Sequence, residues 1–405
     1  MLRGERWRAI SYRATPAAIA LVTGLVLTAL GIEAIRTVRP IEATKQMTWM
    51  VPVLLAMGLC FIPRPKELGM LSYLLFAGVL GVLVVLILPG VPRSIVPVVN
   101  GARCWIDLKV MRVQPSEIAK ITFVLALAWY LRNRESYRTL RGLLVPFVIM
   151  FLPVGLILKQ PDLGTALLFA PVLFAVLVAA GAKLRHMFAL IGIGLFAVGL
   201  NVAVIVVDPP HLTENRTLPS WMHVLKPHQE KRIASMIWPE RYKSREAFQP
   251  RVARRMVGAG AVAGVGAERS QTLIRWNRLP EPHNDMIFAV IVNRWGLAGG
   301  LATIGLYMVL FLALVGAAGR TKDPFARLSI MGFNAMLFTQ ASLNIGVVLG
   351  LLPTTGVTLP FVSYGGSSLI SCFMMLALTL NLSIQKPAII IRPSFEFDRP
   401  DPATE

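Results

Sequence analysis

The sequence predicts an all-α polytopic membrane protein of about ten transmembrane helices, with a large extracytoplasmic loop between helices 7 and 8. Three observations lead to this fold class. The 405-residue chain is 55% hydrophobic and only 15% charged, whereas a soluble domain carries about a quarter charged residues. Its mean hydropathy is +0.63. Apolar runs approaching the roughly 20 residues that a spanning helix needs recur along the chain.

The apolar runs define the expected spans in order. Met1 to Arg13 carries four arginines and no small-residue cleavage site follows, so the first run is interpreted as a signal anchor. The expected spans are centred on Ala17–Ile32, Met47–Ile62, Leu71–Leu88, Ile118–Leu131, Leu143–Leu158, Ala166–Ala182, Met187–Val207, Leu297–Val315, Leu328–Leu352 and Leu359–Leu380. Because residues 286–315 exceed one crossing, the polar interruption at residues 293–296 predicts an interfacial lead-in to the eighth span.

Arginine and lysine in the short loops predict the orientation. They cluster before the first span and after the second, fourth, sixth and eighth, and such loops face the cytoplasm. Both termini are therefore expected to be cytoplasmic. The resulting division is residues 1–13 as cytoplasmic N-terminus, 14–207 as helices 1–7, 208–285 as extracytoplasmic loop, 286–384 as helices 8–10 and 385–405 as cytoplasmic tail.

Charge and cysteine content exclude several classes of function. The net charge of +20 fits basic inner loops and an anionic ligand, and no nucleic-acid partner is expected, because that requires a soluble basic face. Cys60, Cys104 and Cys372 are dispersed, with no disulfide framework or metal spacing. The glycine tract at residues 258–266 lacks the context of a phosphate loop, so close backbone packing or a turn is expected there.

Four clusters of unusual polar residues fall at helix ends or loops, and all four lie on the predicted outer side. This shared side predicts that the clusters, with Glu117, Asp162, Asp285 and Ser363, converge beneath the outer rim, and that binding or chemistry occurs at the outer leaflet. The clusters read NGARCWID with QPSEIAK (residues 100–107 and 114–120), KQPDLGT (159–165), LPEPHND (279–285) and PTTGVTLPFVSYGGSS (353–368).

Each charged residue in these clusters has a structural and a functional interpretation. Glu117 and Lys120 share one helix face and form either a self-satisfied pair or a functional one. Asp162 is either an N-terminal cap or a site carboxylate. Asp285 could also be a cap, but His283 and a basic loop beside it make a general base plausible.

Two further segments bear on binding. The 353–368 stretch is irregular backbone near the membrane, which is tolerated only if it is buried in protein or lines a wet cavity. Arginines of the outer loop can fork onto phosphate oxygens, although most surface arginines are only solvated. The candidates, of which two or three are expected to bind phosphate, are Arg232, Arg251, Arg254, Arg255, Arg269, Arg275 and Arg278.

The four clusters resemble the SEDS family (shape, elongation, division and sporulation), the lipid II-using peptidoglycan glycosyltransferases that include FtsW, RodA and SpoVE. The resemblance covers nearly the whole chain, from the first span to about Leu382. Some motif sequences, including AGAKL at residues 180–184, resemble FtsW and SpoVE more than RodA. Five motifs occur in order and at family spacing: NGARCWID, QPSEIAK, KQPDLGTALL, LPEPHNDMIFAVI and GLLPTTGVTLPFVSYGGSSL.

The resemblance implies a ten-span enzyme of the bacterial cytoplasmic membrane that polymerises lipid II with inversion, in cell division or cell-shape maintenance. Asp285 would be its catalytic carboxylate. No cofactor is certain; a divalent cation, Mg²⁺ or Mn²⁺, is considered, and metal ligands are unknown. The expected partners are lipid II, a class B penicillin-binding transpeptidase and other divisome or elongasome proteins. The residues expected to bind substrate are Arg103, Glu117, Lys120, Asp162, His283 and Ser363.

The sequence departs from the family pattern at Asn293 and Arg294, where the family has a pair of glutamates. This substitution removes negative charge near the expected site, and it keeps a catalytically weak scaffold open as an alternative function. A lipid II flippase is the other alternative. Transporters place charged sites near the bilayer midplane, whereas the charged residues here lie at the outer ends of the helices, which favours the enzyme.

Overall fold

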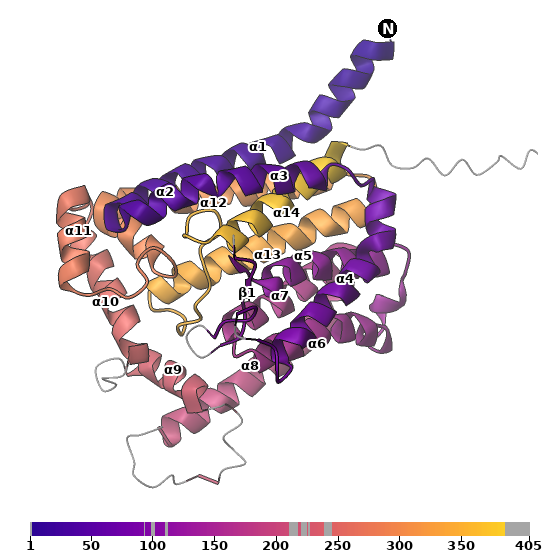
Figure 1. Cartoon of the computed structure of the whole chain (residues 1–405). Coiled ribbons are helices and arrows are strands. Elements are labelled where there is room, and N and C mark those ends of the chain that lie inside the picture. Colours follow the sequence, from indigo (N-terminus) through magenta and orange to yellow (C-terminus); the bar gives the residue numbers. More distant parts are fainter. Residues whose placement is uncertain are drawn as a thin grey trace, which may run out of the picture.

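The computed structural model describes residues 2–92, 94–98, 102–109, 112–209, 218–219, 225, 227–238 and 245–384. These residues form a helical bundle, which confirms the all-α fold class (Figure 1). The first half contains α1 (Leu2–Val38), α2 (Pro40–Thr48), α3 (Met50–Cys60), α4 (Pro65–Ile87), α5 (Pro115–Leu131), α6 (Leu144–Lys159), α7 (Leu163–Ala180) and α8 (Leu184–Val207). The second half contains α9 (Pro227–Ile237), α10 (Arg245–Gly260), α11 (Ala267–Trp276), α12 (Ile287–Arg320), α13 (Pro324–Val348) and α14 (Gly366–Ile384).

Short elements complete the described chain. A two-stranded antiparallel ribbon pairs β1 (Ile106–Asp107) with β2 (Arg112–Val113) directly before α5. Two 3-10 turns, η1 (Ser136–Arg138) and η2 (Arg141–Leu143), connect α5 to α6. The expected tail at residues 385–405 lies outside the described residues. The expected outer loop, residues 208–285, is described only in part, mainly as α9, α10 and α11.

Seven of the described helices are long and apolar enough to cross a membrane, so this is a membrane protein. They are α1, α4, α6, α7, α8, α12 and α14. Three expected spans fall on helices that do not meet that description. The second is divided between α2 and α3 at Trp49, whose dihedral angles stay helical (φ −64°, ψ −17°). The fourth, α5, has 17 residues, and the ninth, α13, carries buried polar side chains along its length.

Helix α13 forms the centre of the bundle. It packs against α5, α7, α12 and α14, and Figure 1 shows it crossing the middle of the molecule while α1 runs along one edge. Its Phe333, Met336 and Leu337 are fully buried. In contrast, α8 exposes most of its apolar side chains, including Phe196 at 75%, as expected of a helix that faces lipid.

The polar interruption expected before the eighth span corresponds to a break within α12. Residues 287–293 are helical and buried in the core, and the helix breaks at Gly296, where φ is +69° and ψ is −163°. A Cβ on Gly296 would lie 2.2 Å from the Val262 carbonyl oxygen. The two segments are joined by backbone hydrogen bonds from the Val265 N–H to the Asn293 carbonyl and from the Leu297 N–H to the Ala261 carbonyl. The glycine tract at 258–266 therefore serves close backbone packing, as its sequence predicted.

The tenth expected span begins too early in the sequence-based assignment. Residues 359–365 are not part of the helix, because α14 begins at Gly366. Residues 349–365, here called the α13–α14 loop, instead fold back over the helix ends. Helix α1 packs closely against this loop: a Cβ on Gly31 would lie 2.3 Å from the Val362 carbonyl oxygen. Only glycine lets the two backbones approach this far.

We predict that Gly31→Ala destabilises the protein, because overpacking a rigid backbone contact costs about 1–3 kcal/mol. Thermal unfolding of the purified protein in detergent measures this. Gly58→Ala in α3 is the matched control, since a Cβ there meets no atom within 4 Å and alanine favours the helix. Equal melting temperatures for the two variants would contradict the close approach of α1 to the α13–α14 loop.

Candidate active site

The four polar clusters come together in the structure, at the ends of several helices. Gln114, which precedes α5, donates its Nε2–H to Asp162 Oδ2 at 3.1 Å and its backbone N–H to Ser367 Oγ at 3.1 Å. Ser363 Oγ donates to the carbonyl oxygen of Asn284 at 2.7 Å. Each hydrogen bond joins a different pair of clusters. The predicted convergence of these segments is therefore present.

Asp285 is the least paired carboxylate at this meeting point. It precedes α12, is half-buried, and accepts no hydrogen bond from any described residue. Desolvation by burial raises the pKa of Asp285 to about 6, helped by the negative charges of Glu281 and Asp162, while Arg232 acts in the opposite direction. A carboxylate with such a pKa exchanges protons near neutral pH, as a general base must.

Asn344 of α13 fixes the backbone that carries Asp285. Its buried Nδ2 group donates to the carbonyl oxygen of Asp285 at 2.9 Å and to that of Val357 at 2.7 Å. One side chain thus joins α13, the segment before α12 and the α13–α14 loop. Gly356 passes beside the carboxylate: it has φ +74°, and a Cβ there would lie 3.6 Å from Asp285 Oδ2. Asp285 is therefore held by its backbone, and its carboxylate has no hydrogen-bond partner in the described part of the chain.

Asp162 is the N-cap of α7. Its Oδ1 accepts the Thr165 backbone N–H at 3.0 Å, and its Oδ2 accepts the Thr165 hydroxyl at 2.8 Å. This is the structural interpretation that the sequence left open. Desolvation raises the pKa of Asp162, and the hydrogen bonds from Thr165 lower it in part. Because its charge also acts on Asp285, Asp162 contributes to the electrostatics of the site.

Glu117 and Lys120 are buried inside the bundle. Lys120 Nζ lies 2.8 Å from Glu117 Oε2 and donates to Gln340 Oε1 at 2.9 Å. Glu117 also accepts a short hydrogen bond from Ser371. The side chains are 1% and 7% exposed for Lys120 and Glu117. The pair is thus satisfied within the protein, and Gln340 connects it to the α13–α14 loop through Thr358.

The other residues expected to bind substrate differ in burial and in how far their polar groups are used within the protein. Ser363 is buried, and its hydroxyl is used internally, accepting the Leu359 N–H and donating to Asn284. His283 is half-buried against Tyr364, with ring centroids 5.6 Å apart. Desolvation lowers the pKa of His283. Arg103 forms no hydrogen bond or ion pair within the described residues, although the Cys104 thiol beside it donates to the carbonyl of Gln160.

Sequence reasoning missed the amides that hold the site together. Gln340 and Asn344 lie four residues apart on α13, so they share one face, and a polar face in an apolar span is the signal that could have found them. Gln46 of α2 was also missed. It donates to the carbonyl of Ser363 and accepts the N–H of Gly365, and its position before an expected span gave no comparable signal.

Asn293 and Arg294 form their hydrogen bonds with α10 and α1. Asn293 Nδ2 donates to the Met256 carbonyl of α10 at 2.8 Å. Arg294 Nη1 donates to the Glu33 carbonyl and the Thr37 hydroxyl of α1, at 2.7 and 2.6 Å. Both residues join α12 to neighbouring helices. Their substitution for glutamates therefore changes helix packing.

The donor set of the site limits how a cation could be held. The described residues contain no group of three or more His, Cys, Asp or Glu side chains that could hold a metal ion. Mg²⁺ commonly takes one or two carboxylates and completes its shell with water and substrate phosphates. Asp285 and Asp162 fit only such a shared arrangement, in which the substrate supplies most ligands.

Taken together, the fold and site define a polytopic α-helical membrane protein with a carboxylate at the helix ends that has no hydrogen-bond partner among the described residues. Residues 13–387 match the family model FTSW_RODA_SPOVE, described as "Cell cycle protein". The chain belongs to this family.

Curated relatives and solved structures agree with this membership. The chain is 32% identical over 368 residues to the probable peptidoglycan glycosyltransferase FtsW of Pseudomonas fluorescens (strain SBW25), covering 88% of this chain and 83% of the relative. It is 33% identical over 307 residues to the stage V sporulation protein E of Bacillus subtilis (strain 168), covering 74% and 75%. A solved chain is similar with a TM-score of 0.72, 30% identity, and coverage of 90% and 96%. That work is described as "Structural coordination of polymerization and crosslinking by a peptidoglycan synthase complex".

We predict that Lys120→Met destabilises the protein strongly, because it leaves the Glu117 carboxylate buried without its cation, which typically costs about 3–5 kcal/mol. The double variant Glu117→Gln/Lys120→Met restores most of the melting temperature. Arg138→Met is the control, since its pair with Glu135 is exposed and 3.8 Å apart, and we expect no shift. A double variant as unstable as the single one would contradict the buried charge pair.

Proposed function

We propose that this protein is a peptidoglycan glycosyltransferase that polymerises lipid II at the outer face of the bacterial cytoplasmic membrane. The observation that carries the proposal is Asp285, a carboxylate without a hydrogen-bond partner in the described chain and with a pKa of about 6. The family membership and the names of the curated relatives agree with it. The outward orientation of the site rests on the distribution of basic loop residues.

The proposed reaction is a single displacement. The Asp285 carboxylate takes the proton from a hydroxyl of the acceptor sugar while that oxygen attacks the anomeric carbon of the donor. The bond between this carbon and the lipid pyrophosphate breaks, and the pyrophosphate leaves with the electron pair on the opposite face, so the configuration inverts. A bound Mg²⁺ or Mn²⁺ ion would supply neutralisation of the leaving phosphates.

The remaining residues of the site have supporting roles in this proposal. Asn344 and Ser363 hold the backbone around Asp285, and the charge of Asp162 adds to the desolvation that raises the pKa of Asp285. His283 and Arg103 are the expected residues with groups left to contact a substrate. The enzyme is proposed to act with a class B penicillin-binding transpeptidase and other divisome or elongasome proteins. The described complex of the similar structure supports such an assembly.

We expect Asp285→Asn to lower the rate at which the purified protein, with its transpeptidase, polymerises labelled lipid II by at least a hundredfold. The variant should stay folded. Asparagine keeps the shape of the side chain but cannot accept the proton. Glu135→Gln makes the same carboxylate-to-amide change at a side chain that is 82% exposed between α5 and α6; it is the control and should be fully active. Equal polymer from Asp285→Asn and wild type would refute the role of Asp285. Lipid movement across vesicles without polymer would favour a flippase, and transpeptidase binding without polymer from the wild type would favour a scaffold.

We expect the polymerisation rate to fall as the pH drops through about 6, because the base must be ionised and the pKa of Asp285 is raised to about 6. Arg232→Gln should move the midpoint of this acid limb to higher pH, since the Arg232 charge lowers that pKa. Initial rates between pH 5 and 8 measure both. The limb should persist in His283→Gln, and its disappearance there would assign it to the histidine.

A further inference from the structure

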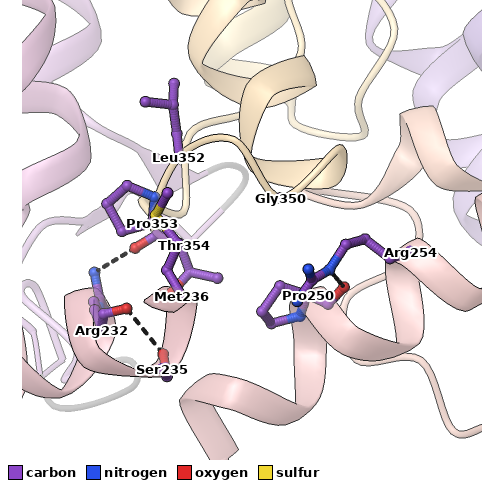
Figure 2. Close-up of a pocket in the computed structure, with 9 residues that line it drawn as sticks. All are labelled: Arg232, Ser235, Met236, Pro250, Arg254, Gly350, Leu352, Pro353 and Thr354. Carbon is purple, nitrogen blue, oxygen red and sulfur yellow. Dashed lines mark hydrogen bonds between the residues drawn. The ribbon is translucent and has the colours of Figure 1, made fainter. Parts of the chain in front are cut away.

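The pocket in Figure 2 lies between α9, α10 and the start of the α13–α14 loop, and it has room for about one water molecule. Arg232 and Arg254 lie on opposite sides of it. Arg232 Nη1 donates to the Thr354 carbonyl at 3.2 Å, and Arg254 Nε donates to the Pro250 carbonyl at 3.4 Å. A space of this size admits no phosphate group. The expectation that outer-loop arginines bind phosphate therefore stays a prediction.

Two arginines that follow α5 are stacked on aromatic side chains. Arg132 Cζ lies 3.0 Å from the centroid of the Trp129 ring, and Arg134 Cζ lies 4.5 Å from that of Tyr130. Such stacking orients a guanidinium and leaves its N–H groups available. Helix α5 has 17 residues, and at about 1.5 Å per residue its ends lie about 25 Å apart. These arginines are therefore remote from Gln114 and the polar clusters at the start of α5.

The Trp129 ring beneath Arg132 is fixed by two other helices. It lies against Gly69 of α4, where a Cβ would collide with the ring. Phe325 of α13 meets it edge-on, with ring centroids 5.3 Å apart and an interplanar angle of 89°. Because the ring cannot shift, the guanidinium stacked on it is held in one orientation.

Neither guanidinium has a counter-ion among the described residues. Arg132 is half-buried and Arg134 is exposed, and their side chains form no hydrogen bond or ion pair there. Desolvation lowers the pKa of Arg132, and the charge of Asp323 acts in the opposite direction. Asp323 is itself engaged as the N-cap of α13, since its Oδ1 accepts the Ala326 N–H at 2.8 Å. The C-terminal dipole of α5 amounts to about half a charge, which is too little to neutralise two cations.

The surface beside the two arginines belongs to α4, a helix apolar enough to cross the membrane. Tyr73 is 45% exposed, and the charges of Arg132 and Arg134 both act on its hydroxyl group. Met70 and Leu74 lie on the same face of α4 and are 55% and 69% exposed, as expected of side chains that face lipid. A ligand held by the arginines would therefore lie next to an apolar, lipid-facing wall.

We propose that Arg132 and Arg134 bind the phosphate of an anionic phospholipid, whose acyl chain lies along Met70 and Leu74. Guanidinium groups fork onto phosphate oxygens, and basic pockets between transmembrane helices bind anionic lipid headgroups. The lipid-facing wall favours a phospholipid over a free phosphate ion, which gains nothing from it. By the orientation that the basic loops predict, this end faces the cytoplasm. The site lies at the other end of α5 from the Asp285 region and does not depend on the proposed reaction.

The test measures phospholipid binding to the purified full-length protein in detergent. Phosphatidylglycerol is titrated, bound lipid is counted by native mass spectrometry, and Kd is determined for wild type, Arg132→Gln/Arg134→Gln and Arg138→Gln/Arg141→Gln. The last variant is the matched control, because it removes the same charge from two exposed arginines of η1 and η2, just after α5. We expect at least a tenfold weaker Kd for the first double variant and less than a twofold change for the control. Equal weakening in both would indicate general attraction to a basic surface and would overturn the proposal.

Two further ligands distinguish an anionic lipid from other sources of phosphate. Inorganic phosphate, added at the concentration of the lipid, should not displace phosphatidylglycerol. Phosphatidylcholine, which has the same phosphate but no net charge, should bind at least tenfold more weakly. Displacement by inorganic phosphate, or equal affinity for the two lipids, would overturn the assignment to an anionic phospholipid.

A lysine variant keeps the test decisive if the glutamine variant fails to fold. Arg132→Lys/Arg134→Lys retains both charges but lacks the planar fork that stacks on Trp129 and Tyr130. We then expect at least a threefold weaker Kd for phosphatidylglycerol. Wild-type affinity in this variant would overturn the proposal.

Discussion

Irregular backbone within a helical membrane protein must find hydrogen-bond partners inside the protein, because lipid offers none. The α13–α14 loop meets this requirement with amide side chains from other elements. Gln46 donates a hydrogen bond to the carbonyl of Ser363, Asn344 to the carbonyl of Val357, and Gln340 to the carbonyl of Thr358. The position of Asp285 depends on this arrangement, since the same Asn344 amide holds its backbone.

The Asp285 carboxylate differs from the neighbouring carboxylates in its hydrogen bonding. Asp162 accepts hydrogen bonds from Thr165 and Gln114. Glu117 forms an ion pair with Lys120 and accepts a hydrogen bond from Ser371. Asp285 has close charges but no hydrogen-bond donor in the described chain. Desolvation without compensation makes a carboxylate basic. The structure thus separates the carboxylates that are held by hydrogen bonds from Asp285, whose carboxylate has no donor among the described residues.

The sequence was sufficient to predict the helical membrane fold and the meeting of the four clusters, because span length and basic loops are local signals. It did not separate structural from reactive residues. Lys120 and Ser363 were expected to bind substrate, yet both are buried and hydrogen-bonded internally. The sequence could pair Lys120 with Glu117 three residues away, but its second partner, Gln340, lies 220 residues away, and Asn284 lies 79 residues from Ser363. No local pattern identifies such partners.

Contacts between distant parts of the chain also determine the role of the two residues that depart from the family pattern. From charge alone, Asn293 and Arg294 in place of glutamates suggested a weakened site. In the structure, Asn293 contacts α10 and Arg294 contacts α1, and the break at Gly296 follows directly. These side chains set how the first turns of α12 sit against their neighbours, and Asp285 is attached to that segment by a single residue, Met286. The two side chains therefore bear on the placement of Asp285 through backbone packing, and the charge of Arg294 lies against Glu33 of α1.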